Sequence, residues 1–302
     1  MQKIRLSYTK MDLILSCERK FQLTALLDNF QQKQASEHFA FGHSLETGCL
    51  SYLLHKDKDR AMWEAYLAYH EVIDEVIEIP QSLKKSELVA VNMVWAAFPY
   101  LDTLLTEWEI AEFNNKPAVQ LSFRIDIDDV FYYVGYLDVA LRNRFTGKYG
   151  VLDVKSTGMN LLSLDPLYMN SEQLIGYSII LDYITGKDNA EYDVTYFVGQ
   201  IGAGDGFSPK IHTLVFPKSL KDRLNFFITL GMDVERLHKM LDTGIFPQRG
   251  HSCLKFNKPC PHFGTCGLHS LDVPKTYEED TTKYDFVAKL EDLITDHLGR
   301  IS

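Results

Sequence analysis

The spacing of hydrophobic and polar positions changes along the chain at about residue 115. Before that point, apolar residues recur every three and four positions, which predicts amphipathic helices near 9–30, 42–56, 58–75 and 85–108. After it, runs rich in Val, Ile, Leu and Tyr predict strands at 118–128, 131–142, 149–155, 191–201 and 210–217. Further helices are predicted at 171–185 and 218–242. This order favours an α/β or α+β fold with a central mixed sheet flanked by helices.

We expect the 302 residues to form a single domain with four parts. These are a helical N-terminal part (1–115), a core (116–217), a helix with a cysteine segment (218–270) and an acidic helical tail (271–302). The tail sequence YDFVAKLEDLITDHL predicts a helix with one apolar stripe, formed by Phe286, Leu290, Leu293 and Leu298. That stripe is expected to dock on the body of the protein, and a partner interface is the alternative. The segment GAGDG between two predicted strands indicates a hairpin turn.

The composition limits the classes of protein to which this chain could belong. The hydrophobic content of 46% supports a substantial core. We see no apolar run that approaches the length of a membrane span and no secretory signal in MQKIRLSYTK, so we expect a cytoplasmic protein without a membrane partner. The net charge of −10 is unfavourable for a nucleic-acid-binding protein unless basic groups or metal ions act locally.

The strongest chemical signal is the run YGVLDVKST, which carries Asp153 and Lys155 one strand after Asp138. Side chains alternate along a strand, so Asp153 and Lys155 share one face. A hairpin about Thr146-Gly147 would place Asp138 opposite Lys155, and the neighbouring register would place it opposite Asp153. Either register brings two carboxylates and an amine together.

Two carboxylates at this distance repel each other unless a cation lies between them, and hard oxygen ligands suit Mg²⁺ or Mn²⁺. The pattern therefore indicates a metal site beside a lysine, with phosphodiester hydrolysis as the expected chemistry. The alternative is a surface hairpin with an ordinary ion pair.

Four of the five cysteines form a second pattern. Cys253, Cys260 and Cys266 lie close together, Cys17 lies far away, and Cys49 is isolated in an apolar helix as a small buried residue. Disulfides are rare in intracellular proteins, so four thiolates could hold an iron–sulfur cluster or Zn²⁺. In a zinc site, nearby histidines could substitute as ligands: His251, His262 and His269.

The segment FGHSLETG reads as the start of a helix with His43 and Glu46 on one face. Either side chain could reach a metal site. The alternative is a solvated glutamate and a partly buried histidine at a helix start.

Together, these motifs resemble the RecB-like branch of the PD-(D/E)xK nucleases. The resemblance rests on GHSLE at 42–46, GYLD at 135–138, DVK at 153–155 and QLIGY at 173–177, bracketed by the four cysteines. It is strongest to members with an iron–sulfur cluster, namely the AddB nuclease domain, exonuclease V and the CRISPR-associated RecB-like nucleases. Similar free-standing proteins occur in phage genomes.

The resemblance implies a role for each matching residue. Asp138 and Asp153 would bind the metal with the Val154 carbonyl, and Lys155 would be the catalytic lysine. Gln173 and Tyr177 match a motif that positions the DNA strand near the site.

The resemblance also implies cluster ligands, which would be Cys17, Cys253, Cys260 and Cys266 around a [4Fe–4S] group. The family's first motif has a glycine, three residues and a histidine. Here that spacing from Gly42 reaches Glu46, while His43 follows the glycine directly. Since several branches carry an acid there, Glu46 is the expected metal ligand and His43 the alternative.

The expected function is metal-dependent DNA hydrolysis, by an exonuclease acting on single-stranded DNA or DNA ends, with a recombination or helicase protein as a partner. Basic groups and aromatic faces should hold the strand, and Arg19, Lys20 and Tyr136 are candidates. Three alternatives remain: a structure-selective endonuclease, a non-catalytic DNA-binding or assembly module that keeps the fold, and a zinc-stabilised interaction protein.

Overall fold

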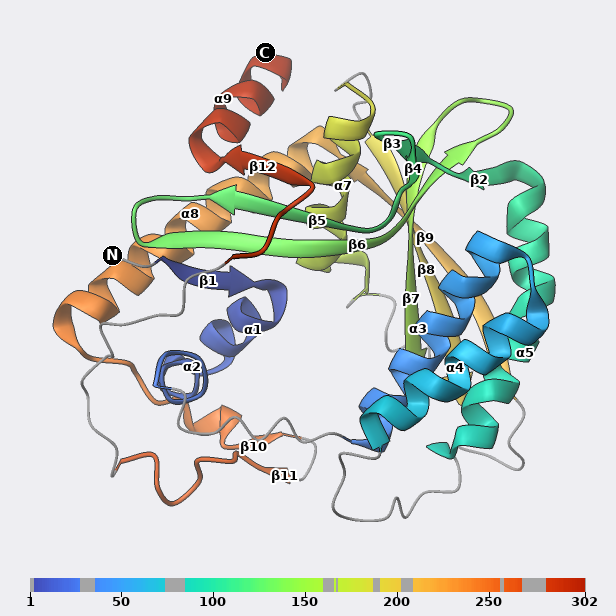
Figure 1. Cartoon of the computed structure of the whole chain (residues 1–302). Coiled ribbons are helices and arrows are strands. Elements are labelled where there is room, and N and C mark those ends of the chain that lie inside the picture. The colour runs from blue at the N-terminus through green and yellow to red at the C-terminus, as the bar shows by residue number, and fades with distance from the viewer. Residues whose placement is uncertain are drawn as a thin grey trace. The chain divides into compact units, whose positions relative to one another are not determined.

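The computed structural model is a mixed α/β protein with a central mixed sheet flanked by helices, as the sequence predicts (Figure 1). The structure describes residues 3–27, 36–73, 85–159, 166, 168–186, 191–201, 209–255, 258–267 and 281–301. The chain divides into two compact units, each built from segments far apart in the sequence. The terminal unit contains residues 1–33, 122–135 and 221–302, and the central unit contains residues 34–121 and 136–220.

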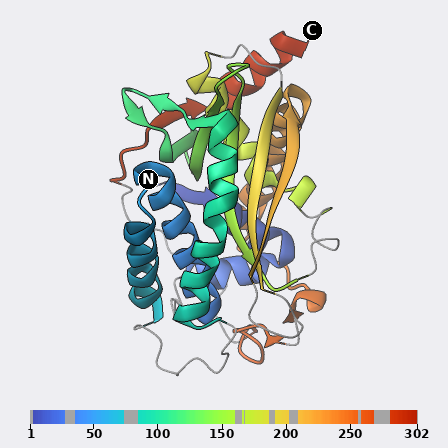
Figure 2. The same ribbon diagram turned by 90° about the vertical axis from the view of Figure 1, so that its right-hand side faces the viewer.

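Three helices of the central unit pack on one another in one layer, namely α3 (Glu37–His55), α4 (Lys58–Ile73) and α5 (Glu87–Glu107) (Figure 2). Helix α3 begins where the Ser36 hydroxyl accepts a hydrogen bond from the Phe39 N–H, and it ends at Lys56 in a left-handed conformation. The sequence places α4 and α5 within two residues of their bounds, because both carry long apolar stripes.

The central unit also contains the short strand β2 (Trp108–Ile110) and four longer strands: β6 (Phe131–Asn143), β7 (Tyr149–Thr157), β8 (Glu191–Ile201) and β9 (Pro209–Ser219). Strand β6 pairs antiparallel with β2 and with β7, β7 pairs parallel with β8, and β8 pairs antiparallel with β9. A short hairpin joins β3 (Glu112–Phe113) to β4 (Lys116–Pro117). Strands β5 (Val119–Asp126) and β6 continue into the terminal unit.

The two faces of β7 meet different surroundings. Leu152 and Val154 are buried in the core of the central unit with residues of α3 and α5. Asp153 points to the other face, where helix α7 (Glu172–Ile184) packs against β7 and β8. The alternation expected from the sequence therefore separates an apolar face from a face that carries ionisable groups.

The terminal unit begins with β1 (Ile4–Ser7), α1 (Tyr8–Ser16), α2 (Glu18–Phe21) and the π-helical turn η1 (Gln22–Leu26). It continues with α8 (Leu220–Thr243), the 3₁₀ turn η3 (Gly250–Ser252), and a hairpin of β10 (Leu254–Lys255) and β11 (Lys258–Pro259). It ends with β12 (Phe286–Lys289) and α9 (Leu290–Ile301). Strand β1 pairs parallel with β6, and β12 pairs parallel with β5.

Several boundaries differ from the predictions. The helix expected at 9–30 is broken at Cys17, whose extended backbone separates α1 from α2. The tail helix begins at Leu290, so Phe286 belongs to strand β12, and Leu298 is 52% exposed. The buried residues of α9 are Leu290, Leu293 and His297. The expected GAGDG turn lies outside the described residues.

Helix α5 also corrects an expectation. Among the described residues it is the one helix whose length and composition would suffice to cross a membrane, although we expected no apolar run of that length. In this structure the helix contributes apolar residues to the core of the central unit, where Val89, Met93, Ala97 and Leu101 are buried. Its buried stripe is therefore explained by packing.

Candidate active site

Strands β6 and β7 bring the two predicted acids together. Their antiparallel pairs run from Arg142 with Tyr149 to Val139 with Leu152. One further step in this register aligns Asp138 with Asp153, and there the Val154 N–H donates to Asp138 Oδ2 at 3.2 Å. A carboxylate thus takes the place of a backbone acceptor at the point where the paired residues end.

The hairpin turn explains the register. The Asn143 side chain accepts hydrogen bonds from the Phe145 and Thr146 N–H groups, and Gly147 adopts a left-handed conformation (φ 69°). The Asn143 N–H donates to the Lys148 carbonyl at 2.7 Å, which closes the turn. The predicted register with Asp138 opposite Lys155 was therefore wrong. The turn is centred on Phe145 and Thr146, one residue earlier than the expected Thr146 and Gly147.

Lys155 lies beside these acids, as the sequence predicts. Its Nζ is 2.7 Å from Asp153 Oδ2. Burial alone would lower the pKa of the ammonium, but the charges of Asp153 and Asp138 outweigh this and raise the pKa above its ordinary value. Lys155 is therefore positively charged at neutral pH.

Asp138 and Asp153 are nearly removed from solvent, with 7% and 0% of each residue exposed. Burial, followed by repulsion from Asp153 and Glu46, raises the pKa of Asp138 to about 8. Lys155 and the Val154 N–H act in the opposite direction but do not cancel the effect. The two carboxylates therefore cannot both be ionised at neutral pH without added positive charge.

Helix α7 contributes Tyr177 and Gln173, one turn apart. The Tyr177 hydroxyl donates to Asp153 Oδ1 at 2.9 Å, and Gln173 Nε2 donates to the Tyr177 oxygen at 2.6 Å. Burial, then the nearby Asp153, raises the pKa of Tyr177 well above its ordinary value, so the phenol stays protonated and remains a donor. This chain of hydrogen bonds fixes the orientation of the Asp153 carboxylate.

Glu46 and His43 are separated by the structure. The segment FGHSLETG lies inside α3 and does not begin a helix, because Ser36 caps α3 five residues earlier. Glu46 accepts a hydrogen bond from Gln120 at 2.9 Å, and its charge helps to raise the pKa of Asp138. His43 instead lies 3.8 Å from Glu71 and stacks on Phe39.

The donor set at the acid pair suits a hard divalent cation. The carboxylates of Asp138 and Asp153 are buried, and Asp153 Oδ2 has the Lys155 ammonium as its neighbour at 2.7 Å. Within the described ranges, no three His, Cys, Asp or Glu side chains already form a metal-binding group. The oxygens therefore fit Mg²⁺ or Mn²⁺ by their chemistry, without a ready-made coordination shell.

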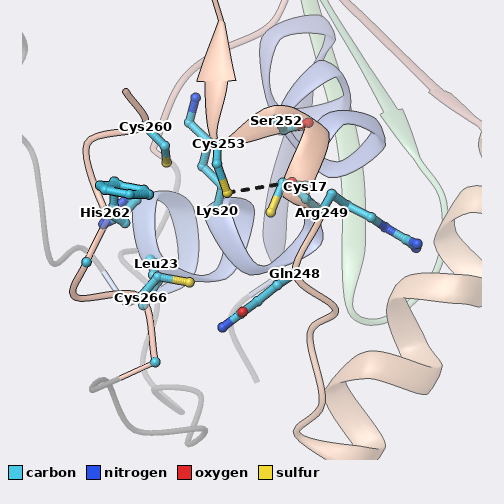
Figure 3. Close-up of a pocket in the computed structure, with 13 residues that line it drawn as sticks. Cys17, Lys20, Leu23, Gln248, Arg249, Ser252, Cys253, Cys260, His262 and Cys266 are labelled. Carbon is cyan, nitrogen blue, oxygen red and sulfur yellow. Dashed lines mark hydrogen bonds between the residues drawn. The ribbon is translucent and has the colours of Figure 1, made fainter. Parts of the chain in front are cut away.

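The four predicted cluster cysteines line one cavity of about 290 Å³ in the terminal unit (Figure 3). Cys17 lies between α1 and α2, and Cys253, Cys260 and Cys266 lie on the segment after α8. The Cys260 N–H donates to the Cys253 carbonyl at 2.8 Å, which draws two of them together. Sulfur donors from both ends of the chain therefore face the same space, which suits a thiolate-bound group.

The histidines near the cysteines differ in placement. His262 lines the same cavity and is buried, with Nε2 3.0 Å from the Thr24 hydroxyl. His251 is exposed, and His269 lies outside the described residues. Of the two candidate histidines that the structure describes, His262 is the one that lines the cavity with the thiols.

Of the three residues proposed to contact nucleic acid, one is corrected. Arg19 is buried, and its guanidinium donates to the Cys266 carbonyl at 3.1 and 3.3 Å and to Gln22. It therefore serves the cysteine segment and is not a surface contact. Lys20 lines the cysteine cavity, while Tyr136 is 41% exposed, two residues before Asp138 on β6.

The sequence did not indicate two tyrosines near the acid pair. Tyr196 on β8 is the strand partner of Asp153, and the Tyr168 ring lies 4.4 Å from the Tyr196 ring. Burial raises the pKa of Tyr168, and Lys155 opposes this effect. The Tyr168 hydroxyl is therefore close enough to the charged groups of the site to be affected by them. Tyr196 reaches Asp153 through the pairing of β8 with β7, and Tyr168, which lies outside the strands, reaches the site through its contact with Tyr196. Neither contact leaves a local pattern in the sequence.

Comparison with known proteins adds little to this geometry. No protein-family model and no curated protein matches the sequence. A crystal structure described as a "Putative exonuclease" from Eubacterium rectale is similar, with a TM-score of 0.48, 10% identity and coverage of 91% of each chain. At this level of similarity, the function has to be argued from the residues themselves.

Proposed function

We propose that this chain is a metal-dependent nuclease of the RecB-like type that hydrolyses phosphodiesters of single-stranded DNA or DNA ends. The observation that carries the proposal is the group of Asp138, Asp153 and Lys155, with Lys155 Nζ at 2.7 Å from a fully buried carboxylate. An ordinary surface ion pair would not need two buried acids, nor a tyrosine that orients one of them. The surface hairpin is therefore the weaker interpretation.

The roles follow from the contacts. A bound Mg²⁺ or Mn²⁺ would supply a water of lowered pKa and polarise the phosphate. Asp138 and Asp153 would hold that ion, with Glu46 and the Val154 carbonyl as further oxygen donors. Tyr177 keeps Asp153 Oδ1 occupied and its side chain oriented. Lys155 would orient the attacking water and offset the negative charge of the transition state.

The net charge also limits where DNA would bind. The chain carries a net charge of −10, so DNA would have to bind close to the cations of the site. Tyr136 is exposed on the strand that carries Asp138 and offers an aromatic face to an unpaired base. We place this activity in the cytoplasm, in DNA recombination, repair or phage DNA processing.

We further propose that the cysteine cavity holds an iron–sulfur cluster with a structural role, with Zn²⁺ as the alternative occupant. Four thiols from both ends of the chain around one cavity support this proposal. Iron and zinc analysis of anaerobically purified protein distinguishes the two, and an iron cluster should give a broad absorbance near ~400 nm.

The decisive experiment compares wild type with Asp153→Ala on 5′- and 3′-labelled single-stranded DNA, with Mg²⁺ or Mn²⁺. We expect cleavage by wild type alone, with DNA binding retained by the variant, and the product ladder gives the polarity. Equal cleavage by both proteins would place the active site elsewhere. Cleavage of circular single-stranded DNA would indicate an endonuclease. Binding without cleavage by wild type would favour a non-catalytic module.

A further inference from the structure

Gln120 has an unusual backbone for a residue within a strand. It is the second residue of β5, yet its φ is 53°, in the left-handed region that side-chain-bearing residues rarely adopt. Such a conformation costs free energy and persists only where the surroundings impose it. Asn114, Asn115 and Lys56 share the left-handed conformation, but they lie in a turn and at a helix end, where it is common.

The side chain of Gln120 meets the helix that carries Glu46. Its Nε2 donates to Glu46 Oε1 at 2.9 Å, across 74 positions of sequence. This face of α3 lies against the end of β7, because a Cβ on Gly42, one turn before Glu46, would lie 3.3 Å from Ser156 Oγ. The hydrogen bond therefore reaches a carboxylate on the side of α3 that approaches the strand of Asp153 and Lys155.

We propose that Gln120 is a positioning residue for Glu46, and that the left-handed backbone serves to aim its amide. A donor on Oε1 would fix the carboxylate and leave Oε2 to face the divalent cation, as outer hydrogen bonds do for metal ligands. The inference rests on the proposed function, since it requires a metal at the acid pair. The inference also distinguishes the two candidate metal ligands on α3. Gln120 donates a hydrogen bond to Glu46, whereas His43 lies beside Glu71.

The test uses the substitution Gln120→Gly, because glycine adopts a left-handed conformation without steric cost. The left-handed backbone is kept and the amide is lost, so the backbone and the side chain are tested separately. We expect Mn²⁺ binding to the DNA-free protein, measured by isothermal titration, to weaken roughly tenfold. The melting temperature should be unchanged or higher. Gln120→Asn, which tolerates the same backbone but has a shorter reach, should also weaken Mn²⁺ binding.

The matched control is Asn115→Gly, which makes the same kind of change in the β3–β4 turn, at φ 60°. It should leave Mn²⁺ binding unchanged. If wild type binds Mn²⁺ and Gln120→Gly binds it equally well, the left-handed backbone of Gln120 has only a structural role and the inference fails, while the proposed function stands. If wild type neither binds Mn²⁺ nor cleaves DNA, both the inference and the proposed function fail.

Discussion

The surroundings of Asp138 disfavour the charged form of its carboxylate. Its carboxylate is buried and faces Asp153, and it accepts the Val154 N–H in place of a strand partner. These surroundings raise its pKa to about 8, against about 3.9 in an unfolded chain. Without metal, the folded protein therefore keeps a proton on Asp138 that the unfolded chain releases at much lower pH.

The proton on Asp138 makes the stability of the metal-free protein depend on pH. Because the folded-state pKa is raised, the stabilisation linked to this proton is complete below pH ~4 and is lost as the pH rises towards ~8. Asp138→Asn cannot lose a proton there, and its Oδ1 can still accept the Val154 N–H. In EDTA, the unfolding free energy of the variant should rise relative to that of wild type as the pH increases from ~5 to ~8. The difference between the two proteins should grow by at least about 1 kcal/mol over this range. Urea unfolding at several pH values measures this difference. Parallel stability curves for the two proteins would show that Asp138 is ionised without metal.

Residue by residue, the sequence predicted contacts that depend on strand alternation or helix periodicity. Asp153 and Lys155 share a face because they are two apart, and Gln173 and Tyr177 meet because they are four apart. It did not predict the hydrogen bond from Gln120 to Glu46, because a left-handed backbone within a strand leaves no compositional trace.

Helix α3 is the element that brings Glu46 to the sheet, and it packs very closely on its neighbours. A Cβ on Gly48 would lie 2.7 Å from both methyl groups of Val94 on α5 and 3.0 Å from Ala65 Cβ on α4. Glycine is unfavourable within a helix, so its presence here is explained by the close approach of the three helices.

Gly48→Ala should therefore destabilise the protein by about 1–3 kcal/mol, despite the better helix propensity of alanine. The double variant Gly48→Ala/Val94→Ala tests the cause, since removing the valine methyls makes room for the new Cβ. The second substitution should cost less in the Gly48→Ala background than in wild type, as a thermal or urea double-mutant cycle would show. Purely additive effects would mean that the contact with Val94 is not the source of the cost.

At the scale of elements, long periodic segments were predicted well and short strands were missed. Strand β8 has the bounds expected from its apolar run, and α7 differs by one residue at each end. Strands β1, β2 and β12 have three or four residues each and are defined by pairing with distant strands. Their hydrogen bonds come from tertiary contacts, which a local pattern does not encode.

At the scale of the molecule, the terminal unit joins the two ends of the chain through more than the cysteines. Glu18, fully buried beside Cys17, forms ion pairs with Arg236 and with Arg249, whose guanidinium donates to both carboxylate oxygens at 2.7 and 2.9 Å. Arg249 lines the cysteine cavity. These ion pairs hold the segments that carry Cys17 and Cys253 together by protein contacts alone.

That arrangement predicts how loss of one cysteine should act. With the proposed iron–sulfur cluster in the cavity, Cys17→Ser should remove the absorbance near ~400 nm and the iron, because one of the four proposed thiolate ligands is lost. The chain should still fold, since the Glu18 ion pairs remain, but both chain ends should become more sensitive to protease, because the group no longer closes the loop between them.

The matched control is Cys49→Ala, at a buried thiol in α3 whose pKa is raised by burial and which lies in the central unit. This variant should keep the colour, the iron content and the protease resistance of wild type. Loss of colour in both variants would show that general destabilisation, and not ligand loss, empties the site. Retention of iron in Cys17→Ser would exclude Cys17 as a required ligand and leave His262, on the same cavity, as the residue to replace next.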